Sequence, residues 1–216
     1  PLLPFFSDDG FTPETMKLSV LISAFLVGPI LIICVIATPN GRASQKPKKQ
    51  SYRLVFNAII ENKPLMILLA GYFLISFSYG IYIGLSFIFA DVYLGIGDKL
   101  PLAYLISSVC GLIGAWLPYR FAQHITKTAG YSWAVMLTAV TFAAVAFIEP
   151  GMSWIYFAIL TGSVFFANSV LQVLVPSLLS DIADYGSWKF RADHSAMYFS
   201  TYLFLQKTNV GIGGAF

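Results

Sequence analysis

This sequence contains few charged residues and few long polar stretches. Only 11% of its 216 residues are Asp, Glu, Lys or Arg, whereas 57% are hydrophobic. Soluble domains carry about 25% charged residues, so this composition excludes an ordinary soluble protein. The chain also lacks the alternating segments of about ten residues that mark the strands of a transmembrane barrel. The composition therefore predicts an all-α membrane protein.

Catalytic and metal-binding motifs are missing as well. Cys34 and Cys110 stand alone, without CxxC or Cys/His spacing, and are interpreted as packing residues. His124 and His194 supply no metal geometry, and no Ser/His/Asp or Cys/His set can be placed. No glycine-rich phosphate loop is present, so the sequence does not indicate a transporter driven by ATP hydrolysis. The sequence thus predicts no enzyme, no cofactor, no metal and no nucleic-acid partner.

Six runs of the sequence are long enough to cross a bilayer, which takes about 20 mostly apolar residues. Five of them contain no charged residue, and the sixth contains only Lys207. The runs are residues 18–41, 64–90, 100–119, 128–148, 150–180 and 195–216. They leave almost no sequence for a soluble domain, so we expect a polytopic helical bundle.

Residues 40–63, between the first two runs, have a different character. They include six of the 13 Lys and Arg residues and a single acid, Glu61. Hydrophobic residues recur there at helical spacing on one face, namely Tyr52, Val55, Phe56, Ile59 and Ile60. This pattern predicts a short amphipathic helix on the membrane surface.

The basic residues also predict the orientation. If the helices alternate in direction, residues 40–63, 120–127 and 181–194 lie on one side and hold 10 of the 13 Lys and Arg residues. The excess of positive charge marks that side as cytoplasmic. Both ends of the chain then lie outside, which does not describe a natural half of a transporter. We therefore expect a fragment of a longer membrane protein.

Lys207 is the one charged residue inside a predicted span. It follows Ser195 by 12 residues, or about 18 Å along a helix, which places it near the middle of the membrane. Burying it there costs roughly 2.5–3.5 kcal/mol, so it needs a partner or a function. We interpret it as a cavity lysine that binds a polar substrate or a carboxylate. The alternative is a lysine that only locks two helices together.

Polar residues in the other spans are further candidates for substrate contact. Asn168 and Gln172 are four residues apart and therefore share a helix face. Such amides bond either another helix or a ligand. Tyr79 in the second span is open to the same two interpretations, packing or ligand contact. The predicted substrate-binding residues are Lys207, Gln172, Asn168 and Tyr79.

Two carboxylates lie at the end of the fifth run. Asp181 and Asp184 are three residues apart, and Arg120 and Arg191 are on the same predicted side of the membrane. An ionic cluster between helix ends can hold the inner side of a carrier shut, provided that it can break and re-form. The alternative is a solvated helix end with exposed acids of little energetic value. We predict a cytoplasmic gate formed by Asp181, Asp184, Arg120 and Arg191.

The run from Asp181 to Lys189, Asp-Ile-Ala-Asp-Tyr-Gly-Ser-Trp-Lys, resembles a known signature. It is similar to the Asp-x-x-Asp-Tyr-Gly-Glu-Trp-Lys motif of the glycoside–pentoside–hexuronide:cation symporters, the melibiose permease-like family of the major facilitator superfamily. Two further motifs of that family have similar counterparts here. One is Lys207 followed by Gly213-Gly214-Ala215, and the other is Asn62-Lys63-Pro64. The sequence departs from the family at Ser187, where the family has Glu, and at residues 190–193.

This resemblance implies helices six to eleven of a twelve-helix carrier. Residues 1–39 would be an outer loop and the last helix of the amino-terminal half, 40–63 the cytoplasmic loop between halves, and 64–216 an incomplete carboxy-terminal transmembrane bundle. Lys207 would correspond to the lysine that joins the sugar and cation sites. The coupling ion, Na+ or H+, would bind in an amino-terminal half that this sequence does not include.

We therefore expect a multi-pass protein of the plasma (inner) membrane that couples uptake of a sugar or glycoside to a cation by alternating access. Its partners would be the small-molecule substrate, the lipid bilayer and the amino-terminal half. Two alternatives remain. The 19 phenylalanines also suit a lipid or other amphiphilic substrate, and the chain could instead be a non-transporting subunit of a membrane complex.

Overall fold

The computed structural model describes residues 13–38, 52–121 and 124–215, and the regular structure within these ranges is entirely helical. The chain divides into two compact units, residues 1–50 and 51–216. Within its described residues, 13–38, the first unit forms the helix α1 (Pro13–Ala37), which continues through Pro29. The second unit contains the helices that position the candidate site, and it is described by itself below.

The second unit begins with the short helix α2 (Tyr52–Glu61) and the long helix α3 (Lys63–Ile88). A π-helical turn, η2 (Phe89–Tyr93), and a 3-10 turn, η3 (Gly97–Lys99), lead into the helices that follow. These are α4 (Leu100–Phe121), α5 (Lys127–Val145), α6 (Trp154–Phe190) and α7 (Ser195–Gly213). Polar side chains begin three of the helices by accepting a backbone N–H: Asn62 for α3, Thr126 for α5 and Ser153 for α6.

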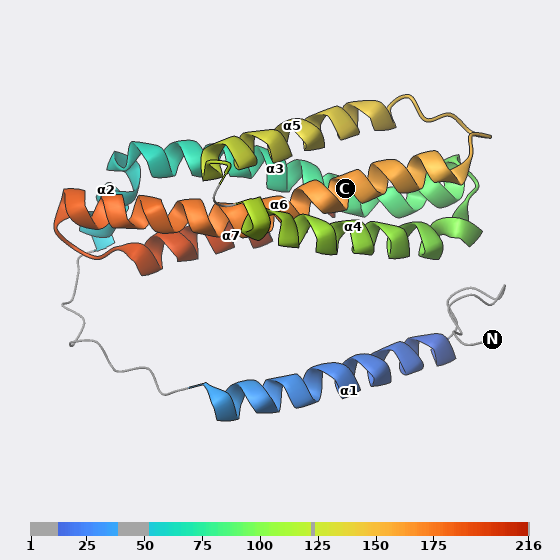
Figure 1. The fold of residues 1–216 in the computed structure, drawn as a ribbon, viewed down its shortest axis with the longest axis horizontal. Helices are drawn as coiled ribbons and strands as arrows, with labels where there is room; N and C mark the ends of the chain where they lie inside the picture. The colour runs from blue at the N-terminus through green and yellow to red at the C-terminus, as the bar shows by residue number, and fades with distance from the viewer. Residues whose placement is uncertain (1–12, 39–51, 122–123, 216) are drawn as a thin grey trace. The chain divides into compact units, whose positions relative to one another are not determined.

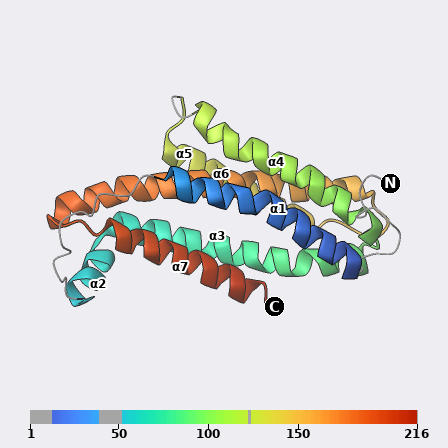
Figure 2. The ribbon, with the colours of Figure 1, turned by 90° about the horizontal axis from the view of Figure 1, so that it is seen from below.

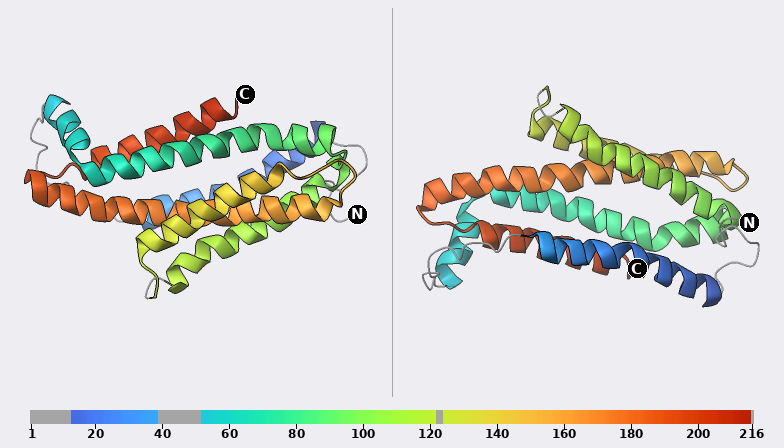
Figure 3. Two further views of the ribbon diagram at one scale, coloured as in Figure 1. Left: turned by 90° about the horizontal axis from the view of Figure 1, so that it is seen from above. Right: turned by 60° about the horizontal axis from the view of Figure 1, so that its bottom comes forward.

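The helices of the second unit pack as two groups (Figures 1 and 3). α4 and α5 lie along α6, and α7 lies along α3. α2 lies at one end of the unit, beside the start of α3 (Figure 2). At that end Lys189 on α6 donates to the Glu61 carbonyl oxygen at 2.7 Å. We call this end, where α2, the start of α7 and the last turns of α6 meet, the α2 end.

The main hydrophobic core lies where α3, α5, α6 and α7 meet. Its fully buried members include Leu65, Leu171, Val175, Leu179 and Tyr198. A smaller cluster at the opposite end joins η2, α4 and α6 through Ala90, Leu100, Ala103, Phe157 and Ala158. α6 contributes to both clusters, which explains why it is the central helix of the unit.

Five helices in the described part of the chain are long and apolar enough to cross a membrane. They are α1, α3 with its π-helical extension, the η3–α4 segment, α5 and α6. This confirms the prediction of an all-α, polytopic membrane bundle. α7, the predicted sixth span, is not among the five, because Gln206, Lys207 and Asn209 make it more polar than the others.

The end of α6 differs from the prediction. The fifth span was expected to end at Ser180, with residues 181–194 as a loop, but α6 continues to Phe190. Gly186 lies within this helix and is buried. A Cβ at this glycine would lie 2.8 Å from the Tyr198 ring, so the glycine serves close packing against α7. The helix ends at Arg191, which has the left-handed φ of 51°, and only residues 191–194 connect it to α7.

The predicted amphipathic helix is present as α2. Ala58 is buried and its carbonyl oxygen accepts the Tyr198 hydroxyl at 3.5 Å, whereas Phe56 and Ile60 remain 62% and 51% exposed. These exposed side chains fit the predicted position on a membrane surface. Residues 40–51 of the predicted first basic loop and residues 122–123 of the second lie outside the described residues.

Candidate functional site

Lys207 lies on the face of α7 that points away from α3. Its own side chain is exposed, whereas Tyr202, Asn209 and Gly213 on the opposite face are buried. The surface around it is apolar: Leu203 and Phe204, one turn earlier, are 49% and 69% exposed. No ion pair involves Lys207 among the described residues, where the pairs are Lys99–Asp98 and Lys127–Asp181. A single cation therefore stands next to two exposed apolar side chains.

Gln172 and Asn168 lie in the middle of α6. Gln172 is exposed and Asn168 is half-buried, in a stretch of the helix that otherwise packs against its neighbours. Pro176, four residues after Gln172, has no N–H to donate to the Gln172 carbonyl oxygen. The same turn of α6 thus presents an exposed amide side chain and a carbonyl that lacks its usual helical donor.

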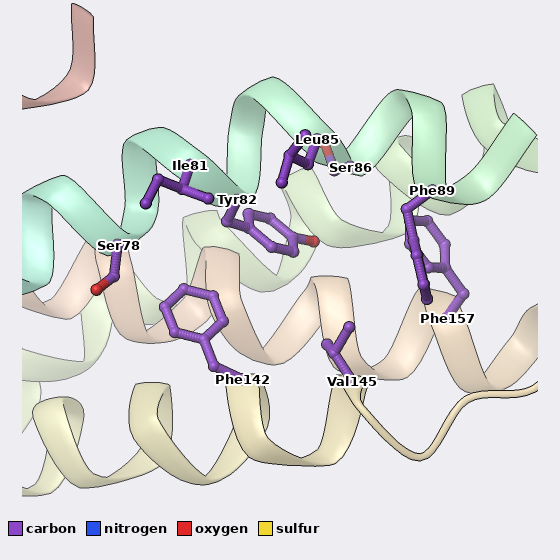
Figure 4. A pocket seen from close by; sticks show the side chains of 9 residues that line it. All are labelled: Ser78, Ile81, Tyr82, Leu85, Ser86, Phe89, Phe142, Val145 and Phe157. Carbon is purple, nitrogen blue, oxygen red and sulfur yellow. The ribbon is translucent and has the colours of Figure 1, made fainter. Parts of the chain in front are cut away.

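Tyr79 lies on α3 beside a cavity between α3, α5 and α6. Its ring stacks on that of Tyr82, with the ring centres 6.5 Å apart. Tyr82 in turn lines the cavity, which has a volume of about 380 Å³ (Figure 4). The remaining lining residues are Ser78, Ile81, Leu85, Ser86 and Phe89 of α3, Phe142 and Val145 of α5, and Phe157 of α6.

The cavity lining offers no unpaired hydroxyl. Ser78 Oγ donates to the Leu74 carbonyl oxygen at 2.8 Å, and the Tyr82 hydroxyl donates to Thr161 Oγ1 at 3.0 Å. Ser86 Oγ donates to the Ile83 carbonyl oxygen at 3.1 Å and also pairs with the hydroxyl of Tyr104. The ring of Phe142 lies against that of Tyr82, with centres 5.5 Å apart. The cavity is therefore an apolar, aromatic space.

Asp181 and Asp184 are both exposed on α6 towards the α2 end. Both oxygens of Asp181 accept from Lys127 Nζ, at the start of α5, at 2.7 Å. Arg120 and Arg191, the expected partners, make no ion pair among the described residues. The Lys127 and Asp181 side chains are 44% and 57% exposed, so water competes with their contact.

Asp193, in the connection between α6 and α7, holds the start of α7. Its carboxylate accepts from the backbone N–H of Ser195 at 2.9 Å and from the Ser195 hydroxyl. These hydrogen bonds hold the pKa of the Asp193 carboxyl below its usual value. Two further side chains at the α2 end, Asn62 and His194, are buried, and Asn62 Nδ2 and His194 Nδ1 have no hydrogen-bond partner among the residues that the structure describes.

The structure joins few of the predicted site residues directly. No hydrogen bond links Lys207, Gln172, Asn168 and Tyr79 to one another among the described residues, and Asp184 forms no ion pair there. The same part of the chain contains no group of His, Cys, Asp and Glu suited to a metal ion. Sequence reasoning missed Lys127 and the buried pair Asn209–Ser76, although an amide two residues from Lys207 was a visible signal.

Comparison with known proteins gives one family. The whole chain, residues 1–216, matches the family model described as MFS/sugar transport protein. The search of curated proteins found no match, and neither did the search of solved structures. Because the family model covers the entire chain, this chain belongs to the MFS/sugar transport family, whose members are membrane transporters of the major facilitator type.

Proposed function

We propose that the chain forms the carboxy-terminal part of a cation-coupled symporter for a sugar or glycoside. The observation that carries this proposal is Lys207, a cation on an exposed, apolar face of α7. A lysine in that setting cannot favourably face lipid, because hydrocarbon offers it no partner. The lysine avoids this cost if it faces a water-filled path that contains a polar substrate, and a transporter provides such a path.

Gln172 and Asn168 supply the remaining polar contacts in this proposal. The amide of Gln172 and its carbonyl, which receives no N–H from Pro176, provide donors and acceptors suited to sugar hydroxyls. Tyr79 adds an aromatic face against which a sugar ring can pack. The coupling ion, Na+ or H+, would bind in an amino-terminal half that completes the path, in the plasma (inner) membrane.

The charged residues towards the α2 end serve as the cytoplasmic gate. Asp181 and Asp184, with Arg120 and Arg191, would hold this side shut through ion pairs with the amino-terminal half. The exposed Asp181–Lys127 pair supports the idea of exchangeable contacts, because a solvated ion pair is weak enough to change partners. Lys127 joins the proposed gate residues on this basis.

The test is uptake by membrane vesicles that contain the full-length protein. A panel of labelled glycosides, pentosides and hexuronides is offered with and without Na+ and proton gradients. The expected result is accumulation of one of them, driven by one of the two gradients. Equal uptake by empty vesicles for every member of the panel would contradict the proposal.

The cavity between α3, α5 and α6 favours a second candidate, transport of an amphiphile. Its lining is aromatic and aliphatic, and its hydroxyls are already engaged, so it suits an alkyl chain better than a sugar. A labelled lysolipid added to the same vesicles distinguishes the two candidates. Accumulation of the lysolipid, unaffected by the glycosides, would favour the amphiphile.

A further inference from the structure

α3 and α7 touch backbone to backbone in their carboxy-terminal halves. A Cβ added at Gly80 would lie 2.9 Å from the Asn209 carbonyl oxygen and 3.0 Å from Val210 Cα. A Cβ at Gly213 would lie 2.8 Å from the Phe77 carbonyl oxygen. Glycines bring the two helices together here, as small residues do in membrane helix pairs. A smooth glycine surface nevertheless gives little resistance to rotation of one helix about its own axis.

One polar contact within this interface can resist that rotation. The Asn209 amide, only 3% exposed, donates to Ser76 Oγ at 2.8 Å and to the Phe73 carbonyl oxygen at 3.3 Å. Ser76 is 4% exposed. Turning α7 would break both bonds of the Asn209 amide nitrogen and leave it unpaired in an apolar surrounding, which is costly, whereas Ser76 Oγ would keep its bond to the Phe73 carbonyl oxygen at 3.2 Å.

Because Asn209 and Lys207 lie on different sides of α7, the contact of Asn209 also determines where Lys207 points. Two residues along an α-helix are separated by about 200° around its axis, so they point to nearly opposite sides. When Asn209 faces α3, Lys207 must therefore face away from α3. The exposure pattern of α7 agrees, since Asn209 is buried and Lys207 is exposed.

We propose that Asn209 and Ser76 are positioning residues, whose hydrogen bond fixes the rotation of α7 and so keeps Lys207 directed into the transport path. The inference rests on the function proposed for Lys207, because only that function gives the direction of its side chain a purpose. The two glycine contacts set how close α7 lies to α3, and the Asn209–Ser76 bond sets which face of α7 looks outward.

The test measures the direction of the side chain without relying on transport. In full-length protein with Cys34 and Cys110 replaced by Ala, single cysteines are placed at Lys207, Gln206 or Thr208, and their reaction rates with a membrane-impermeant maleimide are measured in vesicles. Lys207→Cys should react fastest, since residues 206 and 208 are half-buried. Adding Ser76→Ala should lower the ratio of the rate at 207 to the rate at 206 or 208 by up to about threefold, the change in an equilibrium constant that matches a typical interhelical hydrogen bond in a membrane.

The flanking positions separate rotation from general loosening of the structure. Rotation lowers the rate at position 207 and raises it at 206 or 208, whereas partial unfolding raises all three rates. Ser78→Ala is the matched control, because Ser78 Oγ bonds only to Leu74 of its own helix, and it should leave the three rates unchanged. Unchanged rates with Ser76→Ala, or an unreactive cysteine at 207 in the parent protein, would overturn the inference.

Uptake by the Ser76→Ala protein with Lys207 intact distinguishes the two proposals. Reduced accumulation of a transported glycoside together with the altered labelling pattern supports both. An altered labelling pattern in a protein that transports no member of the panel supports the positioning role and contradicts the proposed function. Unchanged labelling contradicts the positioning role whatever the uptake.

Discussion

Two polar contacts of nearly equal length have opposite roles in this chain. The Asn209–Ser76 hydrogen bond, at 2.8 Å, lies between α3 and α7 with both side chains almost fully buried. The Lys127–Asp181 ion pair, at 2.7 Å, lies between α5 and α6 with both side chains about half exposed. Breaking the first leaves polar groups without water, whereas breaking the second lets water replace the partner. Burial, and not distance, therefore decides which contact is fixed and which can be exchanged.

We expect the largest loss of stability from a substitution at Gly80, where the backbones of α3 and α7 are in contact. Gly80→Ala places a Cβ 2.9 Å from the Asn209 carbonyl oxygen, and backbone atoms cannot move aside as a side chain can. We expect a loss of about 1–3 kcal/mol in the free energy of unfolding, the usual cost of overpacking. Thermal unfolding of the purified protein in detergent measures it as a lower Tm.

Gly211→Ala is the matched control for this prediction. A Cβ at Gly211 meets no atom within 4 Å, although it lies on the same helix as the α3 contact. Alanine also favours a helix by about 1 kcal/mol over glycine, so the Tm should stay level or rise. Equal losses in the two variants would show that α7 does not pack on α3 as described.

A smaller effect is expected at the exchangeable contact. Asp181→Asn removes the ion pair with Lys127, and exposed pairs are worth less than about 1 kcal/mol. We expect little change in Tm, and that change should shrink further in high salt because ions screen exposed charges. A Tm loss as large as that of Gly80→Ala would show that the pair is a fixed structural contact.

The smallest effect concerns Asp193 and the start of α7. Hydrogen bonds from Ser195 lower the pKa of Asp193 in the folded protein, so its charged form contributes stability at pH values above its unfolded pKa of about 3.9. That contribution is lost as the pH falls through the lowered, folded pKa. The Tm difference between the parent and Asp193→Ala should therefore be constant from neutral pH to about pH 5 and decrease in stronger acid. A difference that is the same at all pH values would contradict this origin.

The sequence predicted the helices better than their ends. A bilayer requires long apolar runs, so the approximate positions of the long helices could be inferred from residue types. The end of α6 could not, because Asp181 and Asp184 are compatible with a helix, and Arg191 ends it in a conformation more typical of glycine. The close packing of Gly186 against Tyr198 could not be inferred either, because it depends on where α7 lies.

The contacts between helices were beyond prediction for a related reason. Lys127 pairs with Asp181, 54 residues away, only because α5 begins beside that turn of α6. Likewise, the partner of Asn209 depends on which turn of α3 faces α7. Periodicity identifies the face of one helix, but the relative rotation and register of two helices follow from packing, to which several distant residues contribute.

Gradient-driven uptake by the Lys207→Ala protein tests the central claim most directly. The measurement compares vesicles with equal amounts of inserted parent and variant protein, using the substrate and ion gradient identified from the panel. We expect accumulation to fall to the level of empty vesicles while insertion and Tm are maintained, because the Lys207 side chain makes no ion pair or hydrogen bond among the described residues. Accumulation equal to that of the parent would contradict the assignment of α7 to the transport path.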